Sequence, residues 1–308
     1  MDDTRKQRHG LISAIETERK SKVLAYMLSP RGASVADDVV PPLFHQMITI
    51  GHVEKLELFI SARGGSPESV WRVLSLLREY TDHLSIIIPG QLFSASAFLA
   101  LGADEIVMTP LSELGPMHIQ TMKGDLEEKH FINPFEIIEY MRFASEWDVD
   151  TTTAFDKIEE DPQIIGKAIR AYRLAEHVCT KALGLSSRKY SKTDCESIVG
   201  EFINGSHSSN LPFTPADCRR MGLPVTRVSQ NLERTIASLQ SLYMKTISTP
   251  MPTDASEGTA KRVITPAILE TTRLTLVHKR RLEHGPEGSI RETPGWGGWM
   301  DDTIQEAM

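Results

Sequence analysis

Cysteine is scarce in this chain, and the few cysteines present are far apart. The 308 residues include three, Cys179, Cys195 and Cys218. An odd number at wide spacing excludes a disulfide framework and a CxxC metal knuckle. The sequence also has no apolar run of the about 18 residues that a transmembrane helix needs, and its first residues lack the apolar core of a secretory leader. We therefore expect a cytoplasmic protein that does not associate with membranes.

Several signatures of nucleotide, metal and nucleic-acid chemistry are missing as well. The sequence has no GxxxxGK[ST] loop, no HExxH pair and no GxGxxG segment after a strand. The formal net charge of −7 argues against a general phosphate-binding surface. We expect no cofactor, no metal, no ATP hydrolysis within this chain and no nucleic-acid partner.

The composition that remains is 40% hydrophobic and 24% charged, which suits one large core with a smaller appendage. Strand-like runs alternate with helical patterns through the first third of the chain. The strands are expected at 23–28, 56–61, 83–89 and 105–108, and the helices at 36–50, 67–77 and 94–102. This alternation with short connections predicts an α/β protein with a mostly parallel sheet and right-handed crossovers.

The rest of the chain divides by composition. Further helices are expected at 133–147, 162–184 and 232–243, and a short helix capped by Thr214 precedes a closing strand. We interpret 1–22 as an exposed N-terminal helix, 23–245 as the main domain and 246–308 as a polar tail. The tail is rich in Thr, Pro, Gly and charge, and its segment PGWGGWMDD predicts no regular structure, so we expect it to be flexible and partly disordered. Trp296 and Trp299 in it are costly to expose, which predicts contact with a partner or a neighbouring subunit.

Two short segments suggest a site for acyl transfer. Gly64 and Gly65 lie between a strand and a helix, where glycine lets the backbone approach a ligand closely. Ser94 opens another helix directly after the next strand, so its hydroxyl and the N–H of Ala95 would face one space. Each feature alone fits an ordinary turn or helix cap. Together, on neighbouring strands, they predict a nucleophile beside an oxyanion site.

The same residues resemble the Clp/crotonase superfamily, and within it the serine dehydrogenase proteinase family. The resemblance rests on GGS, IIIPG, ALGADEIVM, LGP at 114–116 and PFTPADCRRMGLPV, and it runs from about residue 8 to about residue 228. It implies a spiral of ββα units, assembly into homo-oligomers and a peptide or protein substrate. It also implies Ser94 as the nucleophile, with Gly64, Gly65 and Ala95 forming the oxyanion hole.

The remaining catalytic groups match the family less closely. His118 follows Ser94 at nearly the spacing of the histidine in Clp peptidases, and an imidazole suits a general base near neutral pH. The position of the orienting acid holds Asn210, which can accept a hydrogen bond from imidazole but stabilises its charged form less well. Ser96 replaces a glycine of the family, and Arg63 replaces a proline.

Three alternatives stay open at this point. A Ser-Lys dyad would use Lys123 or Lys129 as the base, although both lie in a polar segment that would not desolvate an amine. A degenerate, non-catalytic scaffold would explain Asn210, Ser96 and Arg63. A crotonase-type acyl-CoA enzyme would share the oxyanion site. We take an ATP-independent serine peptidase as the leading hypothesis.

Overall fold

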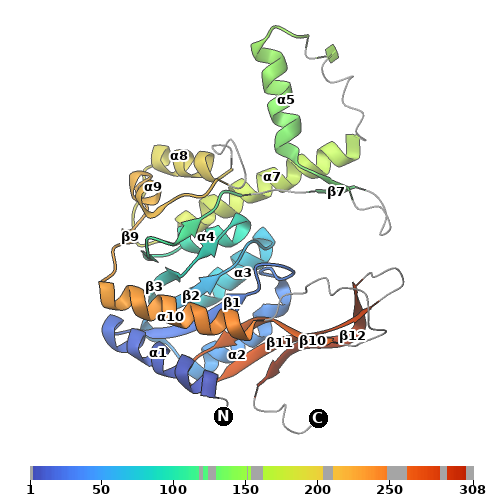
Figure 1. Cartoon of the computed structure of the whole chain (residues 1–308). Coiled ribbons are helices and arrows are strands. Elements are labelled where there is room, and N and C mark those ends of the chain that lie inside the picture. Colours follow the sequence, from blue (N-terminus) through green and yellow to red (C-terminus); the bar gives the residue numbers. More distant parts are fainter. Residues whose placement is uncertain are drawn as a thin grey trace.

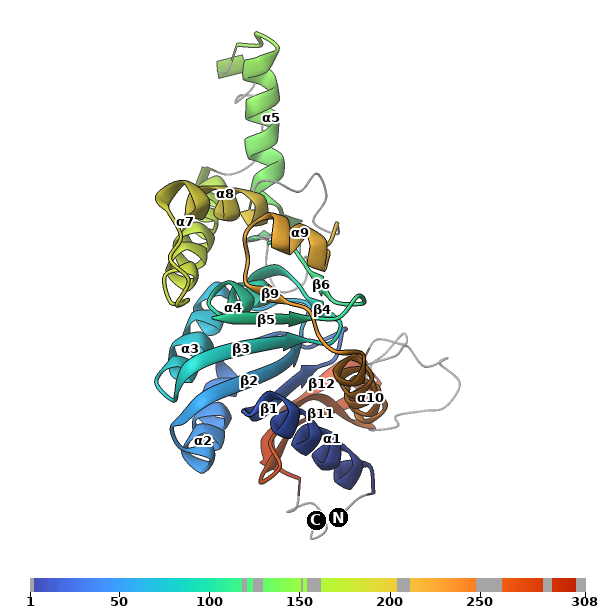
Figure 2. The same ribbon diagram turned by 90° about the vertical axis from the view of Figure 1, so that its left-hand side faces the viewer.

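One large sheet organises the protein, and two sets of helices cover its faces (Figures 1 and 2). The computed structural model describes residues 3–117, 121–123, 130–150, 152–153, 162–203, 211–247, 262–284 and 290–302. Within these ranges the main sheet has eight strands in the order β12-β11-β10-β1-β2-β3-β5-β9. The strands β1, β2, β3, β5 and β9 run parallel to one another, which confirms the predicted α/β class with a mostly parallel sheet.

The parallel strands form where short runs of apolar residues are bounded by turns, as expected for strands buried on both faces. They span Lys22–Leu28 (β1), Val53–Ser61 (β2), Thr81–Ile88 (β3), Glu105–Met108 (β5) and Val225–Thr226 (β9). Alternate side chains of β1 enter different cores: Leu24 and Tyr26 on one face, Val23 and Ala25 on the other. This alternation fixes the register, because a shift of one residue would exchange the two faces.

The first face is covered by helices that connect the strands. The helices next to the sheet span Val40–Ile50 (α2), Pro67–Arg78 (α3) and Ala97–Leu101 (α4). Helix α7 (Pro162–Leu183) packs against α3 and α4, and α8 (Lys192–Ile203) packs against α7. Pro41 and Pro42 occupy the first turn of α2, where no intrahelical N–H is needed. Ser66 caps α3 by accepting a hydrogen bond from the N–H of Ser69 at 3.0 Å, as its sequence position predicts. Helix α8 has no counterpart among the predicted elements.

The opposite face is covered by the N-terminal helix α1 (Asp3–Arg19) and by α10 (Gln230–Thr246). Ile12 and Ile15 of α1 are fully buried against this face, together with Leu232 and Ile236 of α10. Burial of one such side chain contributes about 1.5–3 kcal/mol. The expectation of an exposed N-terminal helix is therefore wrong, because one side of α1 is buried in the core on this face of the sheet.

The C-terminal region corrects a second expectation. Strands β10 (Arg262–Glu270), β11 (Thr275–His284) and β12 (Ile290–Asp301) form an antiparallel extension of the sheet at β1. The segment PGWGGWMDD lies mostly inside β12, contrary to the expected absence of regular structure. The ladder accommodates it because the pairing jumps from Arg280↔Gly297 to Leu282↔Glu292, so residues 293–296 form a bulge. Gly297 then continues the strand with φ of 123°, a conformation that favours glycine.

A second, smaller layer gives the chain its strand–strand–helix repeats. Strand β4 (Gln91–Leu92) pairs in parallel with β6 (Glu113–Leu114). Single bridges extend this layer from Leu92 to Ala62 and from Leu114 to Phe213. The chain thus passes from β2 through Ala62 to α3, and from β3 through β4 to α4, in successive ββα units, as expected.

A projection stands away from the sheet at one end of the molecule (Figure 1). It contains α5 (Pro134–Glu146), close to the hairpin of β7 (Thr121–Lys123) and β8 (His130–Ile132) and to α7. The helices predicted at 133–147 and 162–184 are confirmed as α5 and α7. Phe143 and Trp147 are exposed on the projection and contact each other, with ring centroids 5.5 Å apart. The capped helix after Thr214 is present as α9 (Pro215–Arg220).

Candidate functional site

The first part of the candidate site is the glycine pair between β2 and α3. A side chain at Gly65 would place its Cβ 2.6 Å from the carbonyl oxygen of Val35, so only glycine fits there. The N–H of Val35 donates to the Gly64 carbonyl at 2.9 Å, and the N–H of Ser66 donates to the Val35 carbonyl at 3.2 Å. In such a parallel bridge the residue between the two bonded groups directs its own N–H away from the partner strand. The amide of Gly65 therefore points away from Val35.

The second part is the turn that carries Ser94. Strand β4 ends at Leu92, and the helical turn η2 (Ser94–Ser96) leads into α4. Ser94 has φ of 57°, a left-handed conformation that is uncommon for a residue with a side chain. Holding such a residue costs about 1–3 kcal/mol, and such strain is concentrated at functional sites. A sharp turn between a strand and a helix is also how many hydrolases present a nucleophilic serine.

Neighbouring backbone fixes this turn in place. The N–H of Ser94 donates to the Pro116 carbonyl at 3.2 Å, and its half-buried hydroxyl donates to the sulfur of Met117 at 3.8 Å. Residues 114–117 therefore run alongside Ser94.

The two parts meet. A Cβ built on Gly64 would lie 3.7 Å from Cβ and 4.0 Å from Oγ of Ser94, so the glycine backbone is in contact range of the serine. The amide of Ala95 lies at the first turn of η2, where helical N–H groups have no intrahelical partner. Among the described residues, neither the Gly65 nor the Ala95 amide donates a hydrogen bond. The structure thus brings together the predicted residues Gly64, Gly65, Ser94 and Ala95.

The two departures from the family pattern in this region have local explanations. Ser96 is fully buried, and its hydroxyl donates to the Phe93 carbonyl at 2.6 Å and to the Ala62 carbonyl at 3.4 Å. It therefore ties the Ser94 turn to the end of β2. Arg63 is exposed, and its guanidinium lies 5.8 Å from the ring centroid of Phe93. Neither residue blocks the approach of Gly64 to Ser94.

The predicted base and orienting residues lie largely outside the described residues. This applies to His118, Lys129 and Asn210, while Lys123 is described only in its backbone, within β7. The segments that lead to His118 and Asn210 do meet. The N–H of Met117 donates to the Phe202 carbonyl at 2.7 Å, and the Phe202 and Phe213 rings lie 5.0 Å apart.

The sequence does not predict the role of Val35, whose backbone hydrogen bonds hold the segment that contains the glycine pair. Val35 acts through its backbone N–H and carbonyl, and its side chain is fully buried in the core. A backbone role leaves no chemical signature in the side chain, so no pattern in the sequence indicates it.

Within the described ranges, the two buried cysteines are unreactive and no metal-binding cluster is present. Burial raises the pKa of the Cys179 thiol, and burial followed by the charge of Asp217 raises that of Cys218 to about 12, so both thiols are protonated and inert near neutral pH. No group of three or more His, Cys, Asp or Glu side chains in these ranges is placed to hold a metal ion. No helix in this part of the chain combines the length and apolar character needed to traverse a bilayer.

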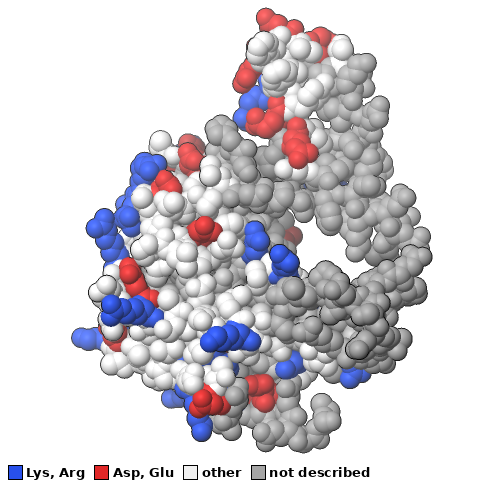
Figure 3. Space-filling view, viewed as in Figure 1, with Lys and Arg blue, Asp and Glu red and all other residues white. Residues whose placement is uncertain are grey.

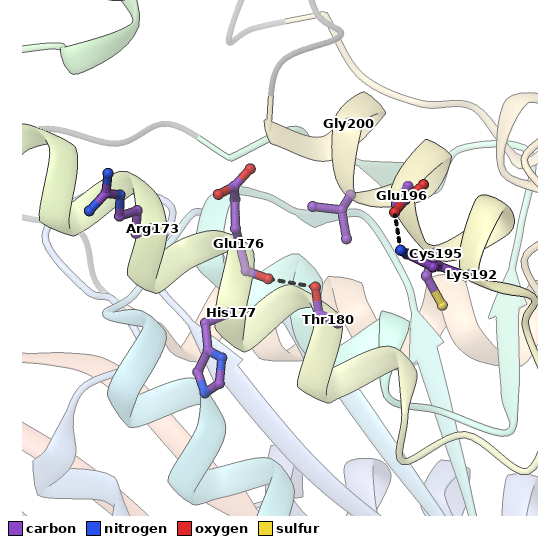
Figure 4. A pocket seen from close by; sticks show the side chains of 9 residues that line it. Arg173, Glu176, His177, Thr180, Lys192, Cys195, Glu196 and Gly200 are labelled. Carbon is purple, nitrogen blue, oxygen red and sulfur yellow. Dashed lines mark hydrogen bonds and ion pairs between the residues drawn. The ribbon is translucent and has the colours of Figure 1, made fainter.

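A separate hollow of about 640 Å³ lies between α7 and α8 (Figure 4). Its lining mixes cationic and anionic side chains with Cys195, and none of the predicted site residues belongs to it. Lys192 lies 3.7 Å from Glu196, and the Thr180 hydroxyl donates to the Glu176 carbonyl at 2.8 Å.

On the face shown in Figure 3, charged side chains of the described residues are scattered among uncharged ones, and acidic side chains gather on the projection around α5.

Comparisons with known proteins give distant similarities. No family model matches the chain. An uncharacterized protein of Methanocaldococcus jannaschii is 24% identical over 188 residues, which cover 61% of this chain, and the chain spans 56% of the length of that relative. ClpP1 from Listeria monocytogenes is similar in structure, with 13% identity, a TM-score of 0.38 and coverage of 68% of this chain and 94% of that one. A membrane-bound stomatin-specific protease is similar with 16% identity, a TM-score of 0.38 and coverage of 70% and 85%.

Proposed function

We propose that this chain is a serine hydrolase that cleaves peptides or unfolded segments, with Ser94 as its nucleophile. The observation that carries the proposal is the contact between two separate segments: Ser94, held at φ of 57°, lies against Gly64. In this proposal the amides of Gly65 and Ala95, next to these two residues in the chain, supply the hydrogen-bond donors. A nucleophile next to preorganised amide donors is the arrangement that acyl transfer requires.

The proposed reaction has two halves. Ser94 Oγ attacks the carbonyl carbon of the substrate while a base takes its proton, and the carbonyl oxygen becomes an oxyanion that accepts hydrogen bonds from the Gly65 and Ala95 amides. The C–N bond then breaks, the amine leaves with the proton from the base, and an ester on Ser94 remains. Water, deprotonated by the same base, attacks this ester and restores the serine.

We propose His118 as the base and Asn210 as the residue that orients it. His118 directly follows Met117, whose sulfur accepts the hydrogen bond from Ser94 Oγ. Asn210 comes three residues before Phe213, which pairs with Leu114 on the same segment. Consecutive Cα atoms are about 3.8 Å apart, so these connections favour both residues near Ser94. Lys123 and Lys129 are the alternative bases.

Labelling with a fluorophosphonate tests the nucleophile, because this probe phosphonylates activated serines. Wild-type protein should be labelled at Ser94, and Ser94→Ala should abolish labelling. Ser75→Ala, which changes a half-buried serine of α3 away from the site, is the matched control and should label like wild type. A folded wild type that stays unlabelled would overturn the proposal and favour a non-catalytic scaffold.

The base is tested by the same assay with four alanine variants. His118→Ala should slow labelling by about 10²–10⁴-fold, the usual contribution of a general base. Asn210→Ala should have a smaller effect, and Lys123→Ala and Lys129→Ala should label like wild type. Loss of labelling in a lysine variant instead of His118→Ala would establish the Ser-Lys dyad.

We also propose that the chain assembles with copies of itself. Tyr140, Phe143 and Trp147 are exposed on the projection around α5, and such residues are costly to leave in water. Light scattering on wild type and on a Phe143→Ser/Trp147→Ser variant tests this. A monomeric wild type would contradict it.

A further inference from the structure

The loop between β1 and α2 supports the glycine pair and is itself held from two sides. Val35 in this loop makes both backbone bonds that flank Gly65, as described above. The next residues form the turn η1 (Asp37–Val39), whose Val39 is fully buried. Any movement of this turn would be transmitted through Val35 to the backbone around Gly65, because only a few bonds separate them.

On one side, Asp37 connects the turn to α3. Its carboxylate accepts a hydrogen bond from the Ser69 hydroxyl at 2.7 Å and forms an ion pair with Arg72. Ser69 is also bonded to Ser66, the cap residue that directly follows the glycines. This contact joins elements that are neighbours in the predicted catalytic domain.

On the other side, Asp38 connects the turn to the C-terminal strands. The indole N–H of Trp299 on β12 donates to Asp38 Oδ2 at 3.0 Å, and His278 Nε2 on β11 lies 3.3 Å from the same oxygen. His278 and Trp299 are direct partners in the β11–β12 ladder, with ring centroids 5.4 Å apart. Trp299 also packs on the buried ring of Tyr26 at 6.1 Å. Arg280 adds a bond to the Gly32 carbonyl at 2.8 Å.

The charge of Asp38 strengthens this contact. The hydrogen bond with His278 lowers the pKa of Asp38, and the bond from Trp299 lowers it further, although partial burial acts in the opposite direction. The carboxylate is therefore ionised near neutral pH. Hydrogen bonds to an ionised acceptor are roughly twice as strong as those between neutral groups.

We infer that the C-terminal strands position the oxyanion loop, with Trp299 as a positioning residue that acts through Asp38, Val35 and the amide of Gly65. The inference rests on the proposed function, because it assigns these contacts a role in the same site. It also gives the strands beyond residue 246 a part in the reaction, although they lie outside the region that resembles a peptidase. Displacing catalytic donors by about 1 Å can cost about 10²-fold in rate.

Trp299→Phe tests the inference, since it keeps an aromatic ring on Tyr26 and removes the N–H. Hydrogen exchange should become at least about tenfold faster at the Val35 and Ser66 amides. The maximal rate constant of fluorophosphonate labelling should fall about tenfold, whereas the half-saturating probe concentration should stay the same, because the loop holds oxyanion donors and not the probe. Val263→Thr, at an exposed position of β10, is the control and should change neither quantity.

Two results would overturn the inference: unchanged exchange at Val35 and Ser66 in Trp299→Phe, or faster exchange with a labelling rate equal to that of wild type. An unlabelled wild type is a failure of the proposed function instead, and the exchange measurement then decides separately whether Trp299 restrains the loop. If Trp299→Phe does not fold, His278→Leu removes the other group on Asp38 and is judged by the same two readouts.

Discussion

Glu270→Gln should destabilise the protein far more than such a small change suggests. Glu270 is the last residue of β10, fully buried, and it is surrounded by hydrogen-bond donors. Arg8 donates to both carboxylate oxygens, at 2.7 and 2.9 Å. The Tyr243 hydroxyl adds a bond at 2.6 Å and the Thr275 hydroxyl one at 2.7 Å. A glutamine amide would place an NH₂ group against these donors and leave the buried charge of Arg8 without its counter-ion.

The size of the effect follows from the ionisation of Glu270. Burial alone would raise its pKa, but the His9 imidazole 3.4 Å away, the hydrogen bonds from Arg8 and the charge of Arg8 outweigh burial and lower the pKa to about 2. The ordinary pKa is 4.5. At about 1.4 kcal/mol per pKa unit, the lowered pKa corresponds to about 3 kcal/mol of stabilisation of the folded protein by the ionised Glu270. This value agrees with the usual cost of removing one partner of a buried ion pair, which is about 3–5 kcal/mol.

Urea unfolding followed by tryptophan fluorescence measures the loss. Glu292→Gln, the same substitution on an exposed glutamate of β12 at 3.8 Å from Arg280, should cost less than about 1 kcal/mol.

The pKa of Glu270 is lower in the folded than in the unfolded protein. Its contribution to stability is therefore present above the unfolded pKa and is lost as pH falls from about 5 to about 2. The difference between wild type and Glu270→Gln should shrink over that range. A loss below about 1 kcal/mol at pH 7, or a difference independent of pH, would refute the reasoning.

Three glycine substitutions test the backbone geometry. Gly65→Ala should destabilise the loop and abolish fluorophosphonate labelling, because its Cβ would lie 2.6 Å from the Val35 carbonyl oxygen; labelling at the wild-type rate would contradict the close approach. Gly297→Ala should loosen β12, because it combines φ of 123° with a Cβ 2.3 Å from the Lys279 carbonyl oxygen. Gly298→Ala has a similar φ but open space, so it should cost only the strain of about 1–2 kcal/mol, and equal urea midpoints for the two variants would show that the contact is unimportant.

The central strands and the site glycines are predictable from sequence because their signals are local. Ile86, Ile87 and Ile88 form an apolar run that fits a strand buried on both faces, and Ser66-Pro67 is a helix start by side-chain chemistry alone. The small residues after Ser94 likewise indicate a buried helix. What they do not indicate is the left-handed backbone of Ser94 itself, because that conformation depends on the bond from its N–H to the distant Pro116 carbonyl.

The C-terminal strands could not be predicted, because their stability comes from contacts far away in the sequence. Pro266 argues against a central strand, yet β10 lies between β1 and β11. The structure accommodates it with a register shift between Ile264 and Ala267, and the Pro266 carbonyl accepts a bond from the Ser29 N–H at 2.7 Å. The partner of Glu270 is Arg8, which is 262 residues away. No local pattern records such a pairing.

These long-range contacts change how the candidate site is understood. In the sequence, the site consists of Gly64-Gly65 and Ser94, and the tail is an appendage. In the structure, the tail strands are fastened to α1 and α10 through Glu270 and reach the loop behind the glycines through Asp38. An oxyanion hole needs donors that are already in place before charge develops. The glycine loop has little side-chain packing of its own with which to hold its amides, so rigidity has to come from neighbouring elements. If the proposed function holds, Val35 and the C-terminal strands provide that support, and removing the tail should lower the rate of labelling at Ser94 as well as the stability.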